Sequence, residues 1–119
     1  MNEDTMHDEV AAIVDTLMSV PYEIGLEDVW QSIKDDLSIT DEHKVKRLTL
    51  EAVREMLRRG AQADFDCGIP AGGHNPETTP DEIVARIERE WAKLKALPTI
   101  GDICAFVWTP AAMEAFGRK

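Results

Sequence analysis

Apolar residues in the first half of the chain recur at steps of three and four, the spacing of one face of a helix. This pattern predicts a helix over residues 8–19 and a second over about residues 26–37. A third helix should begin at Ser38 or Thr40, which can both act as caps, and end at Gly60, which suits a left-handed C-cap. The expected buried positions are Val10, Ile13, Val14, Leu17 and Met18; Leu26, Val29, Trp30, Ile33 and Leu37; and Val45, Leu48, Ala52, Val53, Met56 and Leu57.

The second half of the chain predicts a helix followed by a strand. Thr79, Pro80 and Glu82 have the spacing of a capping box with proline at the first helical position, so a helix should start there. Residues 103–109 are β-branched and aromatic, with apolar residues on both alternating faces, which is typical of a strand covered on both sides. The apolar stripe of the helix is Ile83, Val84, Ile87, Trp91 and Leu94.

Two shorter elements complete the expected fold. Residues 61–65 should form a strand that pairs with residues 103–109, and Thr109 and Pro110 repeat the cap signal for a helix that ends near Phe116. We therefore expect a mainly α (α+β) protein with about five helices and a small two-stranded β-element, in a winged-helix-like order. With 119 residues, 44% of them hydrophobic and 30% charged, the chain should form one globular domain over residues 1–119.

Charge is unevenly distributed along the chain, whose net charge is −10. Residues 1–42 hold 12 acidic residues and one basic residue, Lys34, which gives this third a local charge of −11. Like charges repel over about a Debye length, ~8 Å in physiological salt, so general binding to nucleic-acid phosphates is not expected. Such a surface favours solubility or a basic protein partner.

Composition also bears on the expected location. The N-terminal segment is acidic, the opposite of a signal peptide, and no run approaches the ~18 apolar residues of a membrane helix. We expect a cytoplasmic protein that does not bind membranes. Two cysteines, Cys67 and Cys104, are too few for a disulfide scaffold and are expected to be reduced thiols.

The helix over residues 26–37 should carry an acidic outer face. At 100° per residue, Asp28, Gln31, Ser32 and Asp35 lie opposite its apolar stripe. A rigid row of carboxylates can occupy an electropositive site as a substrate mimic, although a solvated helix face is the simpler interpretation of each residue. The predicted partner-binding residues, which include the turn before the helix, are Tyr22, Glu23, Glu27, Asp28, Gln31 and Asp35.

Lys44, Lys46 and Arg47 form the main basic feature of the expected third helix. They lie in its first turns, where the helix dipole does not favour cations, so another explanation is needed. They could pair with the acidic helices before them, or they could contact DNA. Arg58 and Arg59 need no such explanation, because the last turn of a helix favours cations.

No motif in the sequence indicates catalysis. Cys67 and His74 share a Gly/Pro-rich loop with Asp66, but their spacing matches no zinc site and nothing orients one on the other. A loop thiol and a surface imidazole are the simpler interpretation. We expect no enzyme activity, no metal and no cofactor.

The segment from Ala85 to Pro110 resembles small bacterial proteins that share an Arg-Ile-x-x-Glu-Trp helix and a Gly-Asp-Ile-Cys strand. These resemble immunity proteins of contact-dependent growth inhibition and related polymorphic-toxin systems. The resemblance implies a protein that binds and blocks a cognate basic toxin domain, commonly a nuclease. A winged-helix-like DNA-binding regulator is the alternative, and a small thiol or metal enzyme comes third. The residues that carry the resemblance are Arg86, Ile87, Glu90, Trp91, Gly101, Asp102, Ile103, Cys104, Phe106 and Thr109.

Overall fold

The computed structural model describes residues 3–19, 23–64, 79–94, 97–98 and 103–108. This part of the chain contains four helices and three strands: α1 (Glu3–Leu17), β1 (Glu23–Gly25), α2 (Leu26–Asp36), α3 (Glu42–Arg58), β2 (Gln62–Asp64), α4 (Pro80–Leu94) and β3 (Ala105–Val107). The mainly helical α+β class is confirmed. The fifth helix, expected after Thr109, lies outside the described residues.

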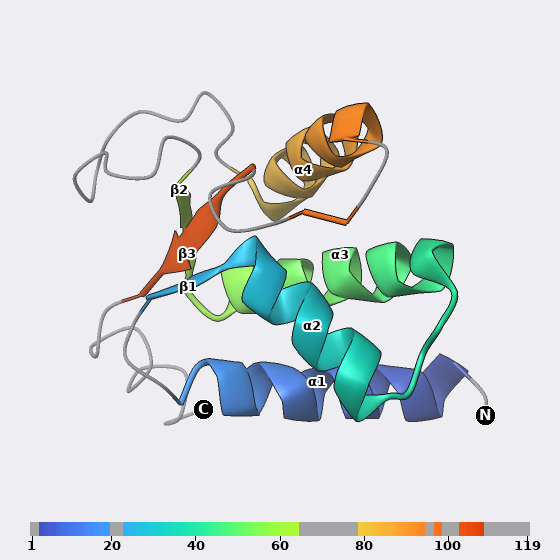
Figure 1. The fold of residues 1–119 in the computed structure, drawn as a ribbon. Helices are drawn as coiled ribbons and strands as arrows, with labels where there is room; N and C mark the ends of the chain where they lie inside the picture. Colours follow the sequence, from blue (N-terminus) through green and yellow to red (C-terminus); the bar gives the residue numbers. More distant parts are fainter. Residues whose placement is uncertain (1–2, 20–22, 65–78, 95–96, 99–102, 109–119) are drawn as a thin grey trace.

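α3 is the central helix of the described part. It contacts α1, α2 and α4, and Figure 1 shows α1 and α4 on either side of α3, with α2 crossing in front of α1 and α3. The order of the helices along the chain was predicted correctly, but α1 begins five residues earlier than expected. Its first residues are acidic, which suits the N-terminus of a helix.

The sheet is antiparallel, with β3 between β1 and β2. Phe106 pairs with Ala63 on one side and with Ile24 on the other. The predicted pairing of residues 61–65 with residues 103–109 is confirmed by β2 and β3. The expectation of two strands is wrong, because β1 makes a third. β1 has only three residues and runs directly into α2, so it is too short to show an alternating pattern.

Most residues of the predicted apolar stripes form one buried cluster, but Leu37 is only half-buried against it and the half-buried Leu94 is not part of it. Trp91 is 5% exposed and Phe106 is fully buried, so α4 and β3 both face this core. Trp30 is only half-buried, and its indole N–H donates a hydrogen bond of 2.6 Å to the carbonyl of Pro98. Thr49 is fully buried, although its polar side chain excluded it from the predicted stripe of α3.

Gly60 ends α3 as predicted. Its φ is 106°, and the backbone N–H groups of Gly60 and Ala61 donate to the carbonyls of Leu57 and Met56 at 3.1 and 3.0 Å. These two bonds, with a left-handed residue after the C-cap, form a Schellman motif. It satisfies carbonyls at the end of α3 that would otherwise have no partner.

The predicted start of α3 at Ser38 or Thr40 is wrong. Asp41 is the N-cap, and its carboxylate accepts a hydrogen bond of 2.9 Å from the backbone N–H of His43. Ser38 instead closes α2 in a left-handed conformation, with a φ of 52°. The bond from the Ile39 N–H to the Lys34 carbonyl, 3.0 Å long, belongs to a second Schellman motif. Ser, Thr and Asp occur together here, and propensity alone did not distinguish them.

The predicted capping box of α4 is confirmed. The Thr79 hydroxyl accepts a hydrogen bond of 3.2 Å from the backbone N–H of Glu82. In return, the Glu82 carboxylate accepts one of 3.2 Å from the backbone N–H of Thr79. These bonds fix the first turn of α4, so the direction of its apolar stripe follows from local sequence.

Candidate binding surfaces

The buried side of α2 determines which of its residues face outward. Leu26, Val29 and Ile33 are buried against α1 and α3, so residues on the other side of the helix remain exposed. Ser32 is half-buried. We call the exposed residues, together with Glu23 of β1, the acidic face: Glu23, Asp28, Gln31, Asp35 and Asp36. Asp36 was not among the predicted residues, although it extends the same face at the end of α2.

Not every predicted residue of this surface is free to bind a partner. The Asp28 carboxylate accepts a hydrogen bond of 3.0 Å from the backbone N–H of Gly25, so it also stabilises the start of α2. Glu27 is half-buried, and its carboxylate lies so close to Gly25 that a Cβ at that position would clash with its Oε1. Tyr22 lies outside the described residues.

The acidic face carries charge that is not neutralised locally. Among the described residues, no ion pair links Glu23, Asp28, Asp35 or Asp36 to a basic side chain. Asp35 and Asp36 also lie in the last turn of α2, where the helix dipole disfavours negative charge. The fold therefore gains little from the Asp35 and Asp36 carboxylates.

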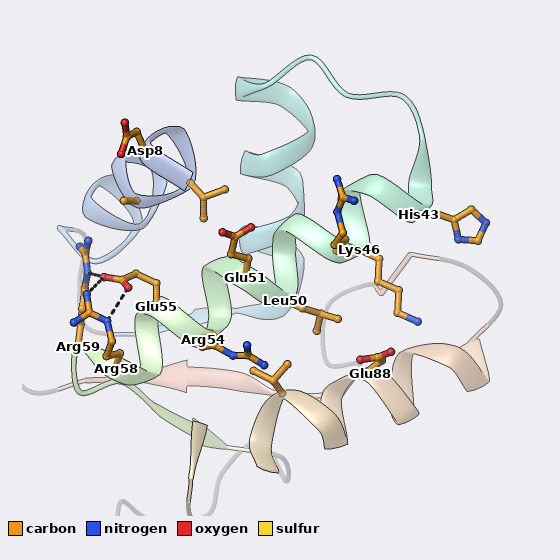
Figure 2. Close-up of a pocket in the computed structure, with 14 residues that line it drawn as sticks. Asp8, His43, Lys46, Leu50, Glu51, Arg54, Glu55, Arg58, Arg59 and Glu88 are labelled. Atoms are coloured by element: carbon orange, nitrogen blue, oxygen red, sulfur yellow. Dashed lines mark hydrogen bonds and ion pairs between the residues drawn. The ribbon is translucent and has the colours of Figure 1, made fainter. Parts of the chain in front are cut away.

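A groove lies along α3, on a side that no residue of α2 lines. It was not predicted from the sequence. It has a volume of about 1000 Å³ and is lined by residues of α1, α3 and α4 but none of α2. Figure 2 shows it along α3, with Leu50 and Arg54 on the side of α4 and Glu51 on the side of α1. Its charged lining residues are Asp8, Lys46, Arg47, Glu51, Arg54, Glu55, Arg58, Arg59 and Glu88.

One end of the groove is a closed ionic network around Glu55. Arg58 donates two hydrogen bonds to its carboxylate, at 2.9 and 2.6 Å, and Arg59 donates a third at 2.7 Å. Arg59 is 8% exposed and also pairs with Asp15 of α1. The hydrogen bonds from Arg58, more than those from Arg59, hold the pKa of Glu55 below its usual value, and Glu55 raises the pKa of Arg58. The sequence predicted that Arg58 and Arg59 interact favourably with the dipole at the end of α3, and the structure shows that both also pair directly with Glu55.

The other end of the groove carries Lys46 and Arg47. Neither Lys46 nor Arg47 forms an ion pair with any described residue. Arg54 pairs with Asp81 of α4 at 3.3 Å, but both side chains are largely exposed. Lys44 is half-buried and does not line the groove. In the described part, the three N-terminal cations of α3 therefore do not neutralise α1 and α2.

The residues considered for chemistry are not assembled into a site that the structure describes. Asp66, Cys67 and His74 lie outside the described residues, and Cys104 is a buried thiol. Within the described ranges, no three His, Cys, Asp or Glu side chains are grouped as metal ligands would be. No helix of the described part is both long and apolar enough to cross a membrane. Neither a protein-family model nor a curated protein nor a solved structure matches this chain.

Proposed function

We propose that this protein is an immunity protein, which binds a cognate toxin domain of the nuclease type through the acidic face and so neutralises it. The observation that carries the proposal is the exposed row of Asp28, Asp35 and Asp36, which has no ion pair with another described residue and lies on a helix whose opposite side is buried. The resemblance of residues 85–110 to bacterial immunity proteins is consistent with it.

Rigidity makes this row suitable for recognising a basic site. Asp28 and Asp35 are two helical turns apart, about 10 Å along the axis at 1.5 Å per residue. A nuclease site that holds phosphates must be electropositive, so carboxylates at fixed spacing can occupy it without a large ordering cost. Glu23 and Gln31 extend this surface, and Tyr22 would add an aromatic contact at its edge.

The test is to express the toxin-like C-terminal domain of the immediately upstream gene in a sensitive host, with and without this protein. We expect wild type to restore growth and to co-purify with the domain. Asp35→Lys should slow association about tenfold at low salt and less at moderate salt, because steering by surface charge is screened. Glu90→Lys makes the same charge change on α4 and is the matched control. Asp28 is left unchanged because it also stabilises α2.

Two outcomes would contradict this proposal. If the host that expresses the domain grows to the same extent with and without this protein, the protein is not an inhibitor of that domain. If Asp35→Lys and Glu90→Lys bind the domain equally well with the wild-type salt dependence, the acidic face is not the interface.

The second candidate is the winged-helix-like DNA-binding regulator, favoured by two cations on α3, the half-buried Lys46 and the exposed Arg47. We rank it lower because α1 and α4 lie on either side of α3 along the groove. A recognition helix must stand clear of its neighbours in order to enter the DNA major groove, which is about 12 Å wide. A gel shift with duplex DNA tests this candidate: binding that Lys46→Glu/Arg47→Glu abolishes would favour it over the inhibitor.

A further inference from the structure

We draw no further inference here: the strongest candidate, the groove between α1, α3 and α4, is lined by cations and carboxylates alike and its valines Val10 and Val84 are buried core residues, so nothing in the structure shows what covers it.

Discussion

Arg59 is a buried side chain with a permanent charge, and its environment explains how the fold tolerates it. Its guanidinium pairs with Glu55 on its own helix and with Asp15 on α1. Burying an ion without a partner costs several kcal/mol, whereas a buried ion with hydrogen-bonded partners is tolerated. The pair with Asp15 links the ends of α1 and α3, which side-chain spacing along the sequence could not reveal.

Glu55→Gln should lower the free energy of unfolding by about 1–3 kcal/mol at neutral pH, because a neutral amide loses charge-assisted hydrogen bonds. The pKa of Glu55 is lower in the folded state than its ordinary value of 4.5, so the unfolded state binds its proton more readily. The stabilisation is therefore complete above that ordinary value and is lost as pH falls through the lower, folded-state pKa. Urea unfolding at neutral pH and at about pH 3 should show the gap between wild type and variant closing. A constant gap would contradict this account.

Trp91 is the largest side chain on the buried stripe of α4 and is 5% exposed. Trp91→Ala should cost about 3–5 kcal/mol, a large part of the ~5–15 kcal/mol stability of a small domain. Thermal melting measures this loss, and Lys93→Ala, on the exposed side of the same helix, is the control. Nearly equal melting temperatures for wild type and Trp91→Ala would show that the side chain does not contribute to the core.

Two helices end in the same motif with different residues at the left-handed position. α3 has Gly60 there, with a φ of 106°, whereas α2 has Ser38, with a φ of 52°. A side chain in the left-handed region costs about 1–2 kcal/mol, and glycine avoids this cost. The two positions therefore offer substitutions of opposite sign.

Gly60→Ala should destabilise the protein by about 1–2 kcal/mol, and Ser38→Gly should stabilise it by about 0.5–1 kcal/mol. Chemical denaturation of both variants measures the two changes, and the denaturant slope should stay constant because the folded surface does not change. Effects of the same sign would mean that the two helix ends do not share this conformation.

The described part of the molecule has two differently charged surfaces: the acidic face lies on α2, and the groove along α3 is lined by both cations and carboxylates. The last turn of α2 holds Asp35 and Asp36, which oppose the helix dipole, whereas Asp28 near its start agrees with the dipole. Asp28 and Asp35 lie on the same face of α2 but near opposite ends of the helix. We therefore expect substitutions at these two positions to change stability in opposite directions.

At low salt, Asp35→Lys should raise the free energy of unfolding by about 0.3–1 kcal/mol, because a cation suits the last turn of α2. Asp28→Lys should lower it by about 0.5–2 kcal/mol, because the Gly25 N–H loses its acceptor and the dipole then opposes the charge. Thermal melts at low and moderate salt test both, and the gain at Asp35 should shrink as salt increases. A loss of stability in Asp35→Lys would show that this carboxylate supports the fold.

Local sequence was sufficient to predict the order and the buried stripes of the helices of the described part, but not where α1 and α3 begin. The stripes of α2, α3 and α4, the capping box at Thr79 and the left-handed Gly60 each depend on residues within a few positions of one another. The outward direction of the acidic face followed from the buried stripe of α2 for the same reason. Such features are readable because helical spacing and cap chemistry act over one or two turns.

Only the tertiary structure determined the features that join distant segments. β1 became a strand because Ile24 pairs with Phe106, and Trp30 turned toward Pro98, 68 residues away. The groove exists because α1 and α4 pack on either side of α3. No local pattern encodes these contacts, since they depend on how whole helices pack once their stripes are buried.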